Sequence, residues 1–478
     1  MQNIINHSGY ISVNRTYKCK NAKEANTELG FESVPMNMDR QYAYDFNNGE
    51  LVIHAFERIS EIDGENKVLG YSYENTPYLF CSQLPINMEE FSAYPQNNHH
   101  KIDYVVKGYR KGGTYKKALF QFDELQYFCT SRSIVKQDAY GNIVFSKEPG
   151  VIKSFTVNIK GIPCKFSFIV GAEGKLRYAH SNMEAVTTII AEFPETSDLE
   201  LLNTIYMIVD CAFSFICNRR NTTCNSMKLS GDYPSKSIKS GKVVDCICKC
   251  SSEIFYFNRY REDPEDIRIV SRTWEASGLL EHIDRLYQMI ADDLNKDADE
   301  GGFISIASIH PSVKRRNLID LQQSLQITGA FEFYVRQYLP NMAVEKDYHI
   351  IMKMLLNELA SKQKGKLKEL AKSLAKNVVR EPALEDKVWK AYKGFDNWSP
   401  LKPCLSEEWF LKDEIKKLAH EVNQWRNELA HSKRSYEPKI DTIRAVRLLE
   451  HMNYAIVLRE LGYGDSEIKE LLGAILIR

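Results

Sequence analysis

The segment from Glu421 to His431, EVNQWRNELAH, closes a longer stretch with helical periodicity. Apolar residues recur three or four positions apart through this stretch, at Ile415, Leu418, Ala419, Val422, Trp425 and Leu429. That spacing puts them on one core-facing side of an amphipathic helix. Asn427 and His431 are four residues apart and share a different face, with Arg426 about 100° round the helix beside them.

Similar helical patterns lie on both sides of this segment. The apolar stripes fall within residues 318–325, 351–374, 415–429, 445–456 and 465–472. Pro340 is expected to stop the first helix, and Asp465 or Ser466 can cap the last one. We therefore predict a bundle of five helices over residues 312–478, preceded by a polar, glycine-ended linker at Asn295–Gly302.

The chain before this linker has the pattern of an antiparallel sheet. Polar and apolar residues alternate in Ser154–Ile159 and Lys165–Val170, and Gly161-Ile162-Pro163 separates the two runs. We expect Gly171–Gly174 to turn the chain again. Helices are expected near 198–213 and 275–294, with strands at 242–250 and 253–257. The predicted fold class is α+β, a strand-rich N-terminal region followed by an all-α helical bundle.

The predicted helix with the stripe from Ile415 to Leu429 ends in the sequence RNELAH at 426–431. This is an Arg-x4-His motif with Asn directly after the Arg. In this helical setting it resembles the signature of HEPN-domain ribonucleases. The arrangement of a strand-rich region and a C-terminal bundle resembles the ApeA-like HEPN family, bacterial proteins associated with abortive-infection defence against phage. The resemblance implies an ApeA-type sensor region over 1–300 that controls a HEPN ribonuclease domain over 312–478.

The three polar residues of the motif suit chemistry on a phosphodiester. His431 can transfer a proton near neutral pH, and Arg426 can hold a phosphate and offset the charge that builds on the phosphorane. Asn427 can orient the histidine or bind the phosphate. Together they favour metal-independent RNA cleavage by the ribose 2′-OH, which leaves a 2′,3′-cyclic phosphate and a 5′-OH. Alternatively, Arg426 pairs with a neighbouring glutamate and His431 simply ends the helix.

One motif supplies one Arg and one His, whereas the reaction benefits from an acid, a base and charge stabilisation. The resemblance implies the missing groups, because HEPN domains pair and build a composite cleft from two motifs. We therefore expect a homodimer or an even-numbered homo-oligomer, with RNA as the substrate and a phage-derived trigger. We expect no cofactor and no metal at these residues.

Basic residues offer further contacts for a polyanion. Lysines and arginines number 63, as do aspartates and glutamates, but residues 311–478 hold 29 basic against 23 acidic side chains. Lys433, Arg434, Arg444 and Arg447 lie close to His431 in sequence and are predicted to bind RNA. The basic run from Lys362 to Arg380 is either the solvated face of an amphipathic helix or a phosphate-binding rim.

The sequence gives no membrane signal and favours a cytoplasmic protein. The N-terminus lacks a signal-peptide pattern, and the apolar run Thr204–Cys217 carries Asp210, as a buried helix could. Eleven cysteines are expected to be reduced thiols. Five of them leave two interpretations open, a zinc site or buried free thiols: Cys217, Cys224, Cys246, Cys248 and Cys250.

Two other classes of function stay open at this point. The HEPN domain could be catalytically silent and bind RNA or a protein partner. Alternatively, the chain could be a regulator that binds nucleic acid through its basic run without cutting it.

Overall fold

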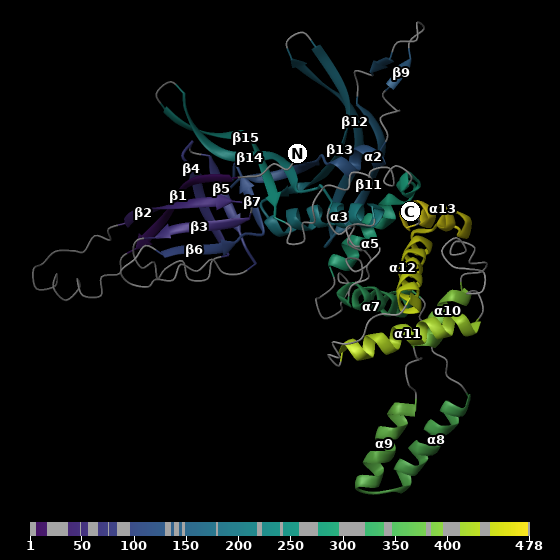
Figure 1. The fold of residues 1–478 in the computed structure, drawn as a ribbon. Helices are drawn as coiled ribbons and strands as arrows, with labels where there is room; N and C mark the ends of the chain where they lie inside the picture. The colour runs from purple at the N-terminus through teal and green to yellow at the C-terminus, as the bar shows by residue number, and fades with distance from the viewer. Residues whose placement is uncertain are drawn as a thin grey trace, which may run out of the picture. The chain divides into compact units, whose positions relative to one another are not determined.

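The structure of the chain is a computed structural model (Figure 1). It describes residues 6–16, 37–47, 49–55, 66–74, 76–83, 96–129, 135–137, 143–145, 149–177, 180–217, 222–239, 242–257, 276–295, 321–338, 347–378, 384–394, 412–430 and 440–476. Contacts divide the chain into two compact units. The first comprises Met1–Gln126, Ser131–Tyr206 and Thr223–Arg261, and the second comprises Tyr127–Thr130, Met207–Thr222 and Glu262–Arg478.

The first unit is built on an antiparallel sheet. Thirteen of its described strands follow the order β11-β12-β13-β8-β14-β15-β7-β5-β4-β1-β2-β3-β6, and β9 pairs with β10 separately. The strands are β1 Asn6–Thr16, β2 Asn37–Asn47, β3 Glu50–Ala55, β4 Lys67–Ser72, β5 Pro77–Cys81, β6 Gln96–Lys101, β7 Tyr104–Lys107, β8 Thr114–Phe120, β9 Val135–Gln137, β10 Ile143–Phe145, β11 Gly150–Ile159, β12 Ile162–Arg177, β13 His180–Thr196, β14 Ser226–Lys239 and β15 Lys242–Tyr256. The predicted strand-rich N-terminal region is confirmed.

The β11–β12 hairpin shows where the sequence pattern succeeds and where it fails. Ile159 pairs with Ile162 across a two-residue turn in which Lys160 and Gly161 have φ of 51° and 84°. Two positive φ values are typical of the tight turns that match strand twist. The turn predicted at Gly171–Gly174 is wrong, because β12 continues through these residues in register with β13. The two separate strands predicted over 242–257 are likewise one strand, β15.

Buried aromatic residues fill the core of the first unit. Tyr44 and Phe46 pack against Phe80 with ring centroids 5.1 and 5.2 Å apart. The ring of Tyr206 stacks on that of Tyr256 at 3.4 Å, and the Tyr256 hydroxyl lies 2.9 Å from Asn203 Oδ1, to which it donates. This contact fastens the first part of helix α3 (Leu199–Cys217) to strand β15 within the unit.

The second unit is helical, as predicted for the C-terminal region, but its division into helices differs. The described helices after residue 312 are α7 Leu321–Tyr338, α8 Asp347–Lys362, α9 Lys366–Val378, α10 Leu384–Gly394, α11 Lys412–Ala430, α12 Ile440–Leu461 and α13 Asp465–Leu476. The prediction of five is wrong for the described residues. The stripe predicted over 351–374 is split at residues 363–365 into α8 and α9, and α10 was not foreseen.

Helix α12 forms the centre of the second unit. Most of its residues from Ala445 to Leu461 are buried, and it packs on α7, α11 and α13. The ring of Tyr454 stacks on Phe215 of α3 at 4.7 Å, and Asn453 Nδ2 donates to the Ile327 carbonyl of α7 at 3.1 Å. Because these contacts involve both apolar and polar groups, they fix the rotation of α12 about its axis.

The last residues of the predicted N-terminal region, from Glu262 onward, belong to the second unit. A 3-10 turn, η3 (Ala276–Leu280), and helix α5 (Ile283–Leu294) replace the single helix predicted over 275–294. Arg285 Nη1 donates to the Leu461 carbonyl at 3.0 Å, so α5 is tied to the end of α12. Of the predicted linker, only Asn295 lies within the described residues. The functional division into 1–300 and 312–478 stays a prediction.

Helix α3 accounts for the long apolar run in the sequence. By length and composition alone it could cross a bilayer, but 67% of its most apolar window is buried inside the structure. Asp210 within it accepts a hydrogen bond from the Thr222 hydroxyl at 2.6 Å. These are the properties of a core helix in a folded protein.

Candidate functional site

Helix α11 carries the first two residues of the motif in its last turns. Five of its predicted core residues are buried, Ile415, Leu418, Ala419, Val422 and Trp425, which confirms the apolar stripe over that length. The helix packs against α10 and α12. Trp425 is only 3% exposed, so the helix is anchored in the bundle at the residue directly before Arg426.

The structure places the motif at the C-terminal end of this helix. The backbone at Arg426 and Asn427 is helical, and α11 ends at Ala430, directly before His431. The side chains of Arg426, Asn427 and Leu429, and the whole of His431, Lys433 and Arg434, lie outside the described residues. Their catalytic and RNA-binding roles therefore stay predictions.

The two remaining predicted RNA contacts are on helix α12, where each has an acidic neighbour. Arg444 is exposed, and its Nη1 lies 3.6 Å from Asp441 Oδ1. Arg447 is 28% exposed and donates from Nη1 to Glu450 Oε2 at 2.8 Å. Glu450 is fully buried, so Arg447 balances a charge inside the bundle. This structural role was not foreseen from the sequence.

Comparison with known protein families assigns this helical region. Residues 325–467 match the Apea-like HEPN family. The chain carries an Apea-like HEPN domain. The matched region begins in α7, ends in α13 and includes the whole motif from Arg426 to His431. This confirms the resemblance drawn from the motif. Neither the curated proteins nor the solved structures include a significant match to the chain.

The HEPN domain also contains a buried histidine that was not predicted from the sequence. His451 of α12 is buried beside Arg447, and its burial, with a smaller contribution from that positive charge, lowers its pKa to about 4. It is therefore neutral near pH 7 and unsuited to proton exchange with a substrate. The sequence signal for these buried polar residues is the placement of Glu450, His451 and Asn453 between two apolar runs, Leu448–Leu449 and Ala455–Leu458.

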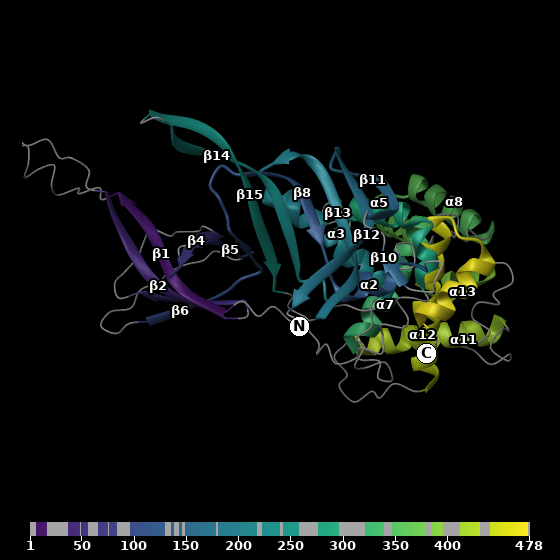
Figure 2. The same ribbon diagram turned by 90° about the horizontal axis from the view of Figure 1, so that it is seen from above.

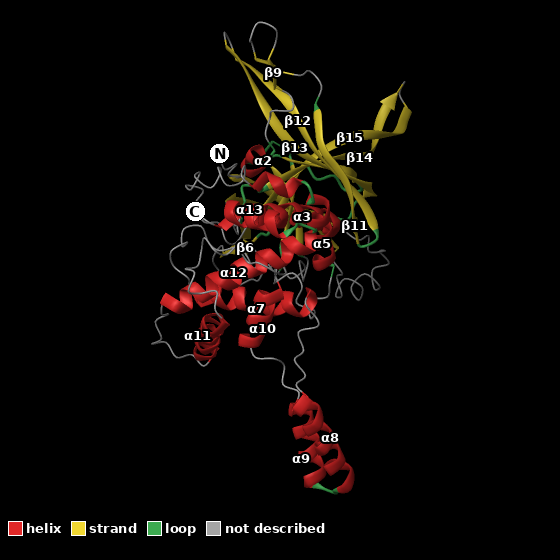
Figure 3. Cartoon of the chain, turned by 90° about the vertical axis from the view of Figure 1, so that its right-hand side faces the viewer, coloured by secondary structure: helices red, strands yellow, loops and turns green. Residues whose placement is uncertain are grey.

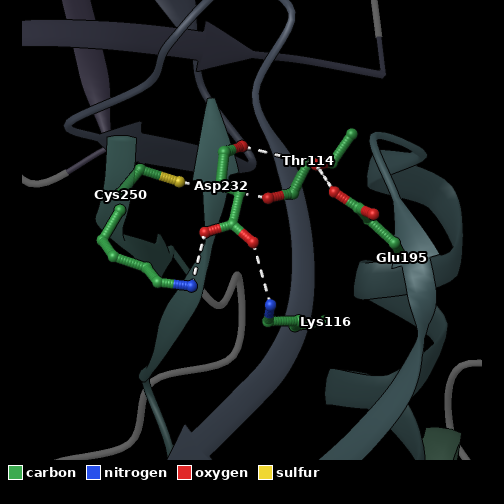
Figure 4. Close-up of polar contacts among 6 residues, drawn as sticks. Thr114, Lys116, Glu195, Asp232 and Cys250 are labelled. Carbon is green, nitrogen blue, oxygen red and sulfur yellow. Dashed lines mark hydrogen bonds and ion pairs between the residues drawn. The ribbon is translucent and has the colours of Figure 1, made fainter. Parts of the chain in front are cut away.

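A separate cluster of charged residues lies in the first unit, where three strands meet. Asp232 of β14 contacts Lys116 Nζ of β8 and Lys249 Nζ of β15, each at 2.8 Å (Figure 4). Hydrogen bonds from these lysines lower the pKa of the Asp232 carboxyl. Nearby, the Thr114 hydroxyl donates to Glu195 of β13.

The close packing of the backbone beside this cluster indicates that the cluster holds strands together. A Cβ at Gly231 would lie 1.8 Å from the Thr114 carbonyl oxygen, so only glycine permits the close approach of β14 to β8. The cluster sits beside this approach and joins β8, β14 and β15, the last two of which form a long hairpin (Figure 2). We assign it no catalytic role.

The five cysteines that could have formed a zinc site are thiols and take part in no disulfide. Cys246 and Cys248 share one face of β15 with their Sγ atoms 3.9 Å apart, whereas Cys217, Cys224 and Cys250 are buried. Among the residues that the structure describes, no group of three or more His, Cys, Asp or Glu side chains is placed to hold a metal ion. Burial of Cys217, Cys224 and Cys250 agrees with the second interpretation, whereas Cys246 and Cys248 are partly exposed.

Proposed function

We propose that this protein is a metal-independent HEPN endoribonuclease that acts in antiphage abortive-infection defence. The observation that carries the proposal is the position of Arg426, Asn427 and His431 within a region that matches the Apea-like HEPN family. HEPN domains include ribonucleases, and this motif has the residue types that RNA cleavage requires. The substrate is host or phage RNA.

The proposed reaction uses the ribose 2′-OH as the nucleophile. His431 exchanges a proton with the 2′-oxygen or the departing 5′-oxygen, and Arg426 stabilises the negative charge on the phosphorane. Asn427 orients the histidine or the phosphate. The bond from phosphorus to the 5′-oxygen breaks, which yields a 2′,3′-cyclic phosphate and a 5′-OH. DNA lacks the nucleophile and is not cut.

Two copies of the motif complete the site in this proposal. A two-fold pair of HEPN domains brings two histidines and two arginines to one cleft, so that one histidine serves as base and the other as acid. The N-terminal region acts as a sensor that restrains the nuclease until a phage-derived trigger is present. Both the RNA substrate and the free thiols fit a cytoplasmic location.

The proposal is tested by substitution of the two central residues. Arg426→Ala and His431→Ala should each reduce cleavage of purified RNA by about 10²–10⁴-fold, the usual loss when a proton-transfer or charge-stabilising group is removed. Asn427→Ala should have a smaller effect, because its role is orientation. The readout is the rate of RNA cleavage at equal protein concentration.

His420→Ala is the matched control on the same helix. His420 is exposed and contacts Glu385 at 2.6 Å, a surface pair of small energetic value. We expect the His420→Ala variant to cleave RNA at the wild-type rate. Wild-type rates in Arg426→Ala or His431→Ala would refute the catalytic assignment. RNA binding without cleavage by the wild-type protein would instead indicate a catalytically silent HEPN module.

A further inference from the structure

Helices α8 and α9 form a helical hairpin within the second unit (Figure 3). They are joined by a short turn in which Gly365 has φ of 68°, a conformation that favours glycine. Where the two helices face each other, the buried residues are small: Ala360 on α8, with Ala371 and Ala375 on α9. The hairpin therefore closes largely through alanines and leaves most of its larger apolar side chains exposed.

Nine large apolar residues of the hairpin are between 40% and 67% exposed. They are Ile350, Ile351, Met352, Met354, Leu355 and Leu359 on α8, with Leu367, Leu370 and Leu374 on α9. On α8 they extend round more than half of the helix circumference, beyond the side that faces α9. An apolar face this wide is normally buried against other elements. The sequence pattern of α8 thus requires a second packing partner.

The exposed apolar area is large enough for a stable interface. From their exposed fractions, the nine residues present roughly 1,000 Å² per hairpin, against about 800 Å² per partner in a standard protein–protein interface. Contiguous apolar patches on monomeric proteins rarely exceed a few hundred Å². A partner of similar size and similar apolar character would be needed to cover this surface.

The positions of the lysines indicate what kind of partner fits. Residues 347–378 include seven lysines and three acidic residues. On α9, Lys368, Lys372 and Lys376 repeat every four residues on the side opposite the leucine stripe. Charges on that side point away from whatever covers the leucines. They would stay solvated in a helical bundle and would gain little from an anionic membrane beneath the leucines.

We infer that the α8–α9 hairpin pairs with the same hairpin of a second copy of this chain to form a four-helix bundle. An identical hairpin supplies an apolar surface of equal length and area, and a two-fold arrangement covers both surfaces at once. Lys368, Lys372 and Lys376 of α9 lie opposite its leucines, so they do not oppose the pairing. Lys362, on the apolar side of α8, is paired with Glu358 of the same helix. The inference extends the proposed function, since this pairing brings a second copy of the motif into the same assembly.

Sedimentation of the full-length protein tests this interface. The wild type should sediment as a dimer or an even-numbered assembly of 55.2 kDa chains. A double substitution on the exposed apolar faces, Met354→Glu with Leu370→Glu, should raise the dissociation constant roughly 100-fold or more, because it puts four carboxylates into the bundle core. Both side chains are exposed in the single chain, so the variant should keep the helical content and melting temperature of the wild type.

The matched control is Lys372→Glu, which adds a carboxylate to the lysine side of α9 and should leave the assembly unchanged. Arg426→Ala should also sediment like the wild type, so a failure of the nuclease proposal is distinguishable from a failure of this one. A monomeric wild type, or an unchanged dissociation constant in the double variant, would overturn the inference. Binding of a monomeric wild type to phosphatidylglycerol vesicles would assign the surface to a membrane instead.

Discussion

The pair of Arg447 and Glu450 makes the stability of the HEPN domain depend strongly on a single side chain, that of Arg447. Glu450 is fully buried, and the Arg447 guanidinium lies 2.8 Å from it. Arg447→Ala should destabilise the protein by about 3 kcal/mol, because it removes the guanidinium that pairs with a fully buried carboxylate. Denaturant unfolding followed by circular dichroism measures this loss.

Two companion variants separate the structural role of Arg447 from a role in binding RNA. Arg444→Ala removes an exposed arginine from the same helix and should change stability by no more than about 0.5 kcal/mol. Replacing the pair with apolar residues, Arg447→Met with Glu450→Leu, should recover most of the stability, since no buried charge is left. An Arg447→Ala protein as stable as the wild type would show that the pair contributes nothing.

His451 should make the stability of the HEPN domain depend on pH. Its pKa is about 4 in the folded protein and about 6.5 when unfolded, so between these values the unfolded chain binds a proton that the folded one does not. Its contribution to stability is therefore complete above pH 6.5 and is lost as the pH falls toward 4. Between pH 7 and pH 5 this amounts to about 2 kcal/mol.

The measurement compares the free energy of unfolding at pH 7 and pH 5 in the wild type and in His451→Gln. Glutamine does not titrate, so the variant should lose about 2 kcal/mol less than the wild type over this interval. Equal losses in both proteins would mean that His451 is already protonated in the fold at pH 5.

At the scale of the element, Trp425 determines how firmly α11 holds the motif. Its indole is buried, and among the described residues its Nε1 has no hydrogen-bond partner. Trp425→Ala should cost about 3–5 kcal/mol through the cavity it leaves, and it should slow RNA cleavage because Arg426 follows directly. Thermal unfolding and the cleavage rate are the two readouts.

Trp425→Phe is the control for that prediction. It keeps an aromatic ring in the core and removes an N–H that makes no hydrogen bond to any residue that the structure describes, so it should cost about 1.5 kcal/mol or less. Cleavage should be close to that of the wild type. If Trp425→Ala were as active and stable as Trp425→Phe, α11 would not depend on this anchor.

The same elements show how far sequence patterns reach. The stripe of α11 was predictable because its apolar residues face one core, at one helical period. The α8–α9 hairpin was not predictable. Its exposed apolar residues keep helical spacing on both sides of residues 363–365, so the pattern does not show that the helix ends there. Gly171 and Gly174 suggested a turn, but the ladder from β12 to β13 holds these glycines in an extended strand.

The candidate site was predictable from a local motif, and its surroundings were not. Arg426, Asn427 and His431 occur within one short segment, so their spacing is visible in the sequence. The partners of Arg447 and His451 depend on which faces of α12 are buried, and α12 is covered by helices distant in sequence, such as α3 and α7. The periodicity of apolar residues along α12 does not indicate which distant helices pack against it.

At the scale of the whole molecule, the chain joins an antiparallel sheet unit to a helical unit that carries an Apea-like HEPN domain. We propose that this domain cuts RNA through its own side chains, by attack of the 2′-OH. The proposed site has an arginine, an asparagine and a histidine and needs no metal ion to generate a nucleophile.

Mapping the ends of RNA cleaved in the presence of EDTA tests this claim most directly. Purified wild-type protein should still cleave, every upstream fragment should end in a 2′,3′-cyclic phosphate, and every downstream fragment should begin with a 5′-OH. An otherwise identical substrate with 2′-deoxy sugars should stay intact. Cleavage that stops in EDTA and returns with Mg²⁺, or that leaves 5′-phosphate and 3′-OH ends, would contradict the account.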